Sequence, residues 1–204
     1  MPILWRKDRN YFMKSSFHLL ITGRPGVGKT TLLKEIISGL LKKKFRLDGF
    51  YTEEIRKNQK RVGFRIMNIQ GQEEGILSHS GLTSRYRIGK YRVDVDKMDE
   101  IVEKIRRSIK SEKIDVVIID EIGPMELYSE NFKGFITNML KRNAPVVIGT
   151  IKEKCLHLLE EWGVSDMVEI KKITERERKA FDKLASEIIT GLRKKVLFLL
   201  TKGC

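Results

Sequence analysis

The segment from Gly23 to Thr30 constrains the fold of this chain more than any other part of its sequence. It matches the phosphate-binding loop pattern G-x-x-x-x-G-K-[ST] at every defined position. An apolar run at residues 17–22 precedes the loop, and an amphipathic helical pattern at residues 32–41 follows it. A buried strand, a loop and a helix in this order are typical of an α/β protein with a parallel sheet.

The residue types of this loop suit the binding of phosphate. Gly23, Gly26 and Gly28 allow the backbone to curve close to phosphate oxygens and to point N–H groups inward, where the N-terminus of the following helix adds partial positive charge. Lys29 is expected to reach the β and γ phosphates, and Thr30 to offer its hydroxyl to Mg²⁺. The alternative is a Gly-rich turn between a strand and a helix that binds nothing.

A second motif is the apolar run Val116-Val117-Ile118-Ile119, which ends in the carboxylates Asp120 and Glu121. In phosphoryl-transfer sites an Asp at the end of such a strand holds Mg²⁺. A Glu that follows it suits water activation, because a carboxylate that faces a γ-phosphate can orient and deprotonate the attacking water. The alternative is an acidic pair that is solvated at a strand end.

Other polar residues are weaker candidates for the site. Thr150 ends the apolar run 146–150 and is either a sensor of the γ-phosphate or a β-branched strand end. The three histidines share no spacing with other metal ligands, and we assign them no role. Several basic residues form either a phosphate or second-substrate contact or, as we expect, a solvated face: Arg56, Arg65, Arg85, Arg87, Lys90 and Arg92.

The order of the remaining patterns predicts a doubly wound, mostly parallel sheet with helices on both faces. Buried strands are expected at residues 17–22, 116–120, 146–150 and 167–170, and helices at 32–41, 98–109, 132–140 and 181–192. Start signals for two helices are Asp96 to Asp99 and the capping box Thr174 to Glu177. Short alternating runs in residues 48–95 predict an antiparallel hairpin insertion, and the apolar run 196–200 a final strand or packed tail.

Composition argues against a membrane-spanning protein, a disulfide-rich protein and a zinc-binding protein. The 204 residues contain 41 Lys+Arg and 27 Asp+Glu, and 33% of the chain is charged, without an apolar stretch of 18 residues. Two distant cysteines give no disulfide framework or zinc site. We expect a cytoplasmic monomer without a membrane segment: a single domain at residues 15–204 that contains the 48–95 insertion, preceded by an extension at residues 1–14.

Together the motifs resemble a known family, the small nucleoside-triphosphatases of thermophiles and their animal relative, the cancer-related nucleoside-triphosphatase, within the P-loop NTPases. Four sequence blocks carry this resemblance: residues 21–31; Gly49-Phe50-Tyr51-Thr52-Glu53-Glu54-Ile55-Arg56 with Arg61-Val62-Gly63-Phe64; Tyr86-Arg87-Ile88-Gly89-Lys90-Tyr91; and Asp120-Glu121-Ile122-Gly123-Pro124-Met125-Glu126-Leu127. The second and fourth blocks are the most specific, since many families share the phosphate loop.

The resemblance implies Mg²⁺-dependent hydrolysis of several nucleoside triphosphates to diphosphate and phosphate. It also implies a nucleotide site formed by two segments, with Thr30 and Asp120 on the metal and with Lys29 and Glu121 in catalysis. The residues of these segments are Gly23, Arg24, Pro25, Gly26, Val27, Gly28, Lys29, Thr30 and Thr31, and Val116, Val117, Ile118, Ile119, Asp120, Glu121, Ile122 and Gly123.

Two other functions fit the same loop. A kinase would move the γ-phosphate to a small molecule or a nucleotide, and the basic residues 85–92 would form its acceptor site or lid. A nucleic-acid-binding ATPase is suggested by the net charge of +14, but half of this charge lies in residues 1–14 and 190–204, which argues against a basic groove. Because the recognised elements all face the phosphates, we expect weak discrimination between ATP and GTP.

Overall fold

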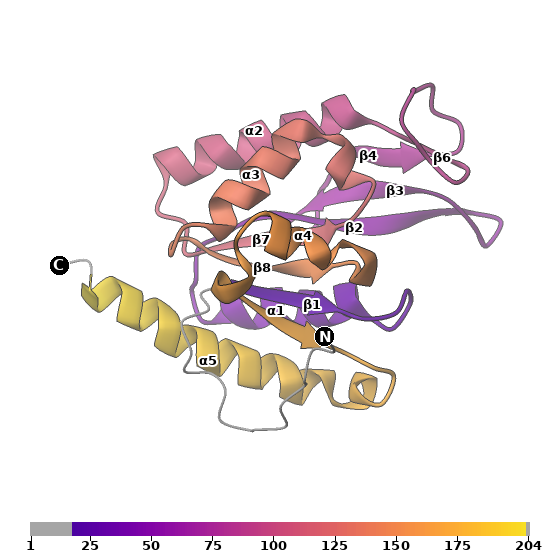
Figure 1. Ribbon diagram of the computed structural model, residues 1–204. Helices are drawn as coiled ribbons and strands as arrows, with labels where there is room; N and C mark the ends of the chain where they lie inside the picture. Colours follow the sequence, from indigo (N-terminus) through magenta and orange to yellow (C-terminus); the bar gives the residue numbers. More distant parts are fainter. Residues whose placement is uncertain (1–17, 203–204) are drawn as a thin grey trace.

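The computed structural model describes the backbone of residues 18–202 and the side chains of residues 18–192. One nine-stranded sheet crosses the molecule in the order β5-β6-β4-β3-β2-β7-β8-β1-β9 (Figure 1). Its strands are β1 (His18–Thr22), β2 (Leu47–Lys57), β3 (Lys60–Asn68), β4 (Glu73–His79), β5 (Arg87–Ile88), β6 (Tyr91–Val93), β7 (Val116–Ile122), β8 (Val146–Ile151) and β9 (Val168–Lys172).

One part of the sheet is parallel. β1 pairs with β8 and β9, β7 pairs with β8, and β2 pairs with β7, all in parallel. Residues 116–119 and 146–148 are almost completely buried, which explains why these strands appear in the sequence as unbroken apolar runs. The four predicted strands are therefore confirmed, although β9 is an edge strand in which only Val168 is buried, and their carboxyl ends meet at one edge of the sheet.

The other part of the sheet is antiparallel. β2 pairs with β7 through residues 47–50 and then with β3 through residues 50–57, so the same strand belongs to both parts. β3, β4, β6 and β5 continue the sheet outward from β2 as antiparallel neighbours. The predicted antiparallel hairpin strands are present, but the first of them, β2, also pairs with the parallel part of the sheet. The β2–β3 hairpin extends beyond the neighbouring strands at the right of Figure 1.

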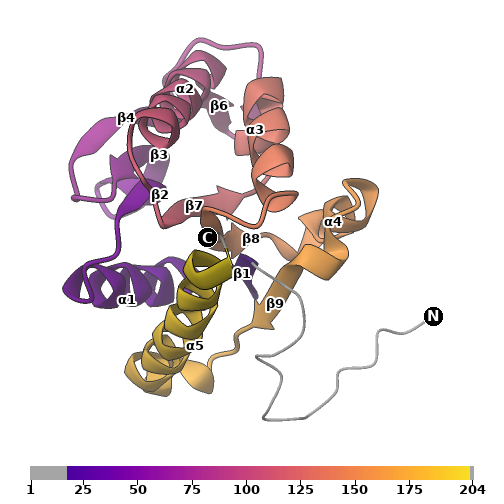
Figure 2. The ribbon, with the colours of Figure 1, turned by 90° about the vertical axis from the view of Figure 1, so that its left-hand side faces the viewer.

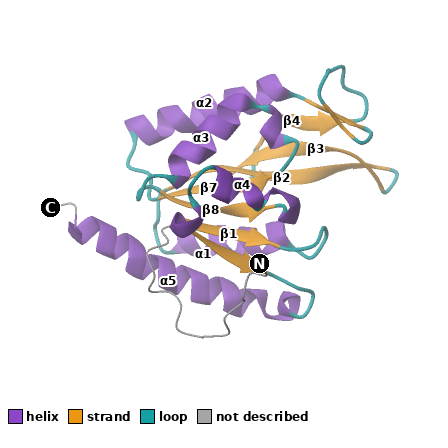
Figure 3. Cartoon of the chain, viewed as in Figure 1, coloured by secondary structure: helices purple, strands orange, loops and turns teal. Residues whose placement is uncertain are grey.

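Helices cover both faces of the sheet (Figures 2 and 3). α1 (Lys29–Lys42) and α5 (Phe181–Lys202) lie on one face, and α2 (Val95–Ser111), α3 (Glu130–Leu140) and the short α4 (His157–Glu161) lie on the other. Alternate residues of β7 face the two layers: Ile118 packs with α1 and α5, whereas Val117 and Ile119 pack with α2 and α3. This arrangement confirms the predicted doubly wound α/β fold.

The structure differs in detail from the predicted starts of two helices and from the strand predicted at residues 196–200. α2 is capped by Asp94, whose side chain accepts a hydrogen bond from the backbone N–H of Lys97, so the start lies two residues before Asp96. Glu177 does reach back to the N–H of Thr174, at 2.7 Å, but a 3₁₀ turn (Glu177–Ala180) follows before α5 begins. Residues 196–200 are helical and continue α5, so the first of the two predicted alternatives, a final strand, is wrong.

The predicted extension at residues 1–14 lies outside the described residues. Within residues 18–202, no helix combines the length and the apolar character that a membrane span requires.

Candidate active site

The phosphate loop connects β1 to α1 at the edge where the parallel strands end. Gly23, Gly26 and Gly28 have backbone φ values of 151°, 78° and 105°, which residues other than glycine rarely adopt. A Cβ at Gly23 would lie 2.6 Å from the carbonyl oxygen of Ile173, and one at Gly28 would lie 2.8 Å from the ring of Phe181. The loop therefore needs two of these glycines both for their backbone conformation and for the close packing of the segment that follows β9.

Asp120 lies near the end of β7 and is held by hydroxyls from two other elements. The Thr30 hydroxyl, in the first turn of α1, donates to Asp120 Oδ2 at 2.8 Å, and the Thr150 hydroxyl at the end of β8 donates to Oδ1. Asp120 is only 1% exposed, and this burial raises the pKa of its carboxyl. The hydrogen bonds from the two hydroxyls offset part of the rise. Three elements thus meet at one carboxylate.

Glu121 lies between two ammonium groups. Lys29 Nζ is 3.4 Å from its Oε1, and Lys152 Nζ is 3.2 Å from its Oε2. Lys29 also donates to the carbonyl oxygen of Gly23 at 3.3 Å, which keeps its ammonium beside the loop. Among the described residues Glu121 Oε1 has no hydrogen bond, so this carboxylate has unused capacity to accept a proton or a water.

Glu126, from the same sequence block, is a second buried carboxyl at this edge. It is 4% exposed, and its Oε2 has no hydrogen-bond partner among the described residues. Burial, with a smaller contribution from the negative charge of Glu121, raises the pKa of Glu126 from 4.5 to about 8. The Glu126 carboxyl is therefore mainly neutral at pH 7.

The structure brings the two predicted segments of the nucleotide site together, but their side chains differ in access. Asp120, Glu121 and the backbone of Gly123 lie at the edge beside the loop, whereas the side chains of Val116–Ile119 and Ile122 are completely buried. The buried residues carry Asp120 to the edge as part of β7. In the loop, Val27 is buried and residues 24–26 are exposed, and Thr31 is exposed on the first turn of α1.

Three residues at this edge escaped the motif analysis. Lys152 and Glu126 contribute the groups described above, and the backbone of Thr52 in β2 helps to lower the pKa of Asp120. Lys152 follows Thr150 by two residues, so the polar end of the run 146–150 is the signal that could have found it. The signal for Thr52 and Glu126 was only their place in the sequence blocks that resemble a family.

The basic residues of the antiparallel part find partners there. Arg65 pairs with Glu53 and Glu73, and Arg56 pairs with Glu54. The side chains of Arg87 and Arg92 donate to backbone carbonyls of their own hairpin segment, Gly89 and Ser84. These contacts place the side chains against their own part of the sheet, and the expected solvated face stays a prediction.

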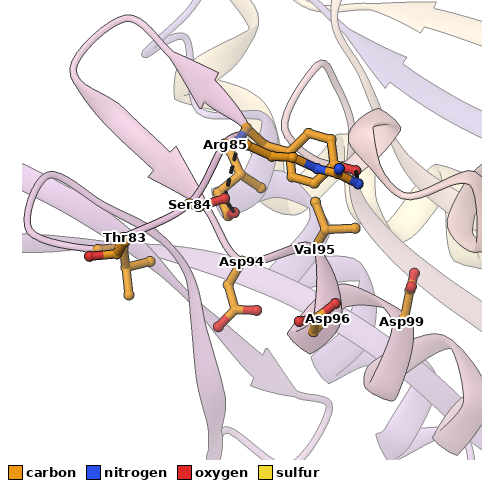
Figure 4. Close-up of a pocket in the computed structure, with 10 residues that line it drawn as sticks. Thr83, Ser84, Arg85, Asp94, Val95, Asp96 and Asp99 are labelled. Carbon is orange, nitrogen blue, oxygen red and sulfur yellow. Dashed lines mark hydrogen bonds between the residues drawn. The ribbon is translucent and has the colours of Figure 1, made fainter.

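Two surface hollows of about 610 Å³ lie outside the phosphate loop. The first is lined by residues 82–86 and by the start of α2, with Asp94, Asp96 and Asp99 around it (Figure 4). Two of these carboxylates already have structural partners, since Asp94 caps α2 and Asp99 accepts from Ser129. The second hollow lies between Tyr86, Tyr128 and α4. Neither is lined by residues 23–30.

The donor set at Asp120 fits a magnesium ion that also binds nucleotide phosphates. Thr30 Oγ1 and Asp120 Oδ2 are hard oxygen donors 2.8 Å apart, and Mg²⁺ is usually held by one or two carboxylates with phosphates and water. Within the described residues no group of three or more His, Cys, Asp and Glu forms a self-contained metal site.

Comparison with known proteins identifies similar chains. A family model described as NTPase matches residues 18–189. The nucleoside-triphosphatase THEP1 of Thermotoga maritima is 41% identical over 176 residues, which cover 86% of this chain and 95% of that protein. The crystal structure of THEP1 from Aquifex aeolicus is similar with a TM-score of 0.71, 34% identity and coverage of 86% and 98%. The solution structure of a human cancer-related nucleoside triphosphatase gives 0.72, 32%, and 88% and 98%.

Proposed function

The chain belongs to the nucleoside-triphosphatase family, and from that membership we propose a Mg²⁺-dependent phosphohydrolase whose reacting groups are Lys29, Thr30, Asp120 and Glu121. It is an enzyme that hydrolyses nucleoside triphosphates, the activity for which its relatives are named. The proposal adds the metal, the role of each residue and the breadth of substrates.

The observation that carries the proposal is the contact between Thr30 and Asp120. It joins the phosphate loop to the end of β7 at 2.8 Å, and Glu121 is the next residue along the chain. A hydroxyl–carboxylate pair that suits a metal, and a carboxylate with one oxygen that has no hydrogen bond among the described residues, thus lie together beside the glycine-rich loop. This is the arrangement that hydrolysis of a γ-phosphate requires.

Each residue has a distinct task in this scheme. The backbone of residues 23–30 binds the phosphates, Lys29 neutralises charge near the γ-phosphate, and Thr30 with Asp120 holds Mg²⁺. When bound, Mg²⁺ neutralises charge on the β and γ phosphate oxygens. Glu121 orients a water toward the γ-phosphorus and accepts its proton as the new O–P bond forms.

We also propose that the enzyme discriminates weakly between bases and acts as a cytoplasmic monomer. The four reacting groups are assigned to phosphate, metal or water, and no residue is assigned to a base. Comparable kcat/KM values are expected for ATP and GTP, because a thousandfold preference would need about 4 kcal/mol of base-specific contact.

Phosphate release from a panel of nucleoside triphosphates, with Mg²⁺ or with EDTA, tests the proposal. We expect release from ATP, GTP, CTP and UTP without any added acceptor, and no release in EDTA. Full activity in EDTA would contradict the assignment of Thr30 and Asp120. Phosphate transfer that starts only when an acceptor is added would favour a kinase instead.

A further inference from the structure

Lys152 is a cation of the site that no motif includes. It directly follows β8, and its ammonium lies 3.2 Å from Glu121 Oε2, opposite the ammonium of Lys29. Among the described residues these two lysines are the cations that form ion pairs with Glu121. The residue assigned to water activation therefore lies between one lysine of the phosphate loop and one lysine that directly follows β8.

The chain holds Lys152 in this place through several contacts. Its backbone N–H donates to the carbonyl oxygen of Ile122 at 3.1 Å, which ties the end of β8 to the end of β7. Its aliphatic stem lies over the backbone of Gly123, where a Cβ would come within 3.3 Å and 3.4 Å of Lys152 Cδ and Cε. The side chain is 36% exposed, so the ammonium keeps enough freedom to move between neighbouring anions.

Hydrolysis of a triphosphate is accelerated by positive charge close to the γ-phosphoryl group in the transition state. Negative charge spreads over the γ-phosphoryl oxygens in the transition state, and many related enzymes meet it with an arginine supplied in cis or in trans. The ion pair of Lys152 with Glu121 weakens as soon as Glu121 accepts the proton of the attacking water. Since Lys152 lies beside the carboxylate that faces the attacking water in this scheme, its ammonium is then free to turn toward the phosphoryl oxygens at the step in which charge develops there.

We propose that Lys152 is a catalytic cation, acting in cis, that stabilises the γ-phosphoryl group during hydrolysis. This inference rests on the proposed role of Glu121. In the step, the water oxygen bonds to the γ-phosphorus, its proton goes to Glu121, and the bond from that phosphorus to the bridging oxygen breaks with its electron pair leaving on the diphosphate. Lys152 exchanges no proton and moves from the Glu121 carboxylate to the phosphoryl oxygens.

Single-turnover hydrolysis of Mg·ATP by Lys152→Ala tests this role, with Lys154→Ala as the matched control. Lys154 is exposed and lies in the 3₁₀ turn just beyond the site, so its loss should leave the rate at the parent value. Lys152→Ala should lower the rate about 10²- to 10³-fold with substrate affinity changed less than about threefold, and Lys152→Arg should restore part of it. Equal thermal unfolding midpoints confirm that the variants fold.

Two further measurements separate a direct role from the mere orientation of Glu121. Lys152→Ala should weaken binding of ADP with Mg²⁺ and aluminium fluoride, which mimics the transferring phosphoryl group, at least tenfold more than binding of ADP alone. In a Glu121→Gln background it should lower the residual rate further. A parent rate in Lys152→Ala, or no further loss in that background, would overturn the proposal. A parent rate in Glu121→Gln would instead contradict the proposed function, while the aluminium fluoride measurement would still report on Lys152.

Discussion

Glu121 and Glu53 are both carboxylates that lie between two cations, but in different parts of the sheet. In the antiparallel part, Glu53 accepts from Lys34 at 2.5 Å and from Arg65 at 3.1 Å, and the hydrogen bond from Lys34 is the main cause that lowers its pKa. At the parallel edge, the lysines lie 3.4 Å and 3.2 Å from Glu121, and one of its oxygens has no hydrogen bond among the described residues.

The difference separates a structural ion pair from a reactive one. The cations around Glu53 are 41% and 39% exposed, so water screens their attraction to the carboxylate. Each oxygen of Glu53 already accepts a hydrogen bond from one of them, which leaves it less able to accept a proton from water. Lys29 is only 11% exposed, and the loose contact leaves both it and Glu121 available to a phosphate and a water. Substitutions at the parallel edge should therefore change turnover, and those in the antiparallel part should not.

The largest effect is expected for Lys29→Ala. Loss of this ammonium removes charge beside the γ-phosphate, so hydrolysis should fall at least about 10³-fold, and triphosphate should lose more affinity than diphosphate. Lys34→Ala, on the same helix but paired with Glu53, is the matched control and should keep turnover near the parent value. Phosphate release and nucleotide titrations measure both. Similar losses in the two variants would break the comparison.

Glu126→Gln should change the pH dependence of stability without nucleotide or metal. The pKa of Glu126 is about 8 in the folded protein and 4.5 as its ordinary value, so the folded state binds more protons between these pH values and stability falls as pH rises from about 4.5 to 8. Glutamine stays neutral and removes this fall. The variant should match the parent at pH 5 and be more stable at pH 9 by at least about 1 kcal/mol, or roughly 2–4 °C in Tm.

Denaturant unfolding at both pH values measures this difference. Comparing variant with parent cancels the titration of groups that both proteins share. An equal difference at pH 5 and pH 9 would show that Glu126 does not titrate as its burial requires.

The smallest effect is expected for Glu53→Gln. Its two partners are exposed, so the substitution should lower the free energy of unfolding by about 1 kcal/mol or less and leave kcat within about threefold. Phosphate release and denaturant unfolding give both values. A tenfold loss of kcat would place Glu53 in the site and remove the distinction from Glu121.

The sequence predicted the parallel part of the fold well because burial on both faces leaves unbroken apolar runs. Residues 116–120 and 146–150 are such runs, and they lie in β7 and β8. It predicted the antiparallel part less well, since β2 is parallel to β7 at one end and antiparallel to β3 at the other, and no local pattern shows that a strand has two kinds of neighbour. The apolar run 196–200 suited a strand as well as the helix it extends.

The same limit applies to the site. Lys29, Thr30, Asp120 and Glu121 lie in motifs whose spacing reflects direct contact with phosphate, metal or water. Lys152 reaches the site only because β7 and β8 are neighbours in the sheet, and that proximity depends on strand order rather than on spacing along the chain. Glu126 begins the 3₁₀ turn that follows β7. Thr52 acts on the pKa of Asp120 only through its backbone, which any residue would supply.

Single-turnover hydrolysis of Mg·ATP by Glu121→Gln tests most directly whether this carboxylate activates water. Glutamine keeps the shape and most contacts of glutamate but cannot accept the proton. The rate of the chemical step should fall about 10²- to 10⁴-fold with nucleotide affinity nearly unchanged. A parent rate in this variant would contradict the water-activating role and the reactive character assigned to the loose ion pairs around Glu121.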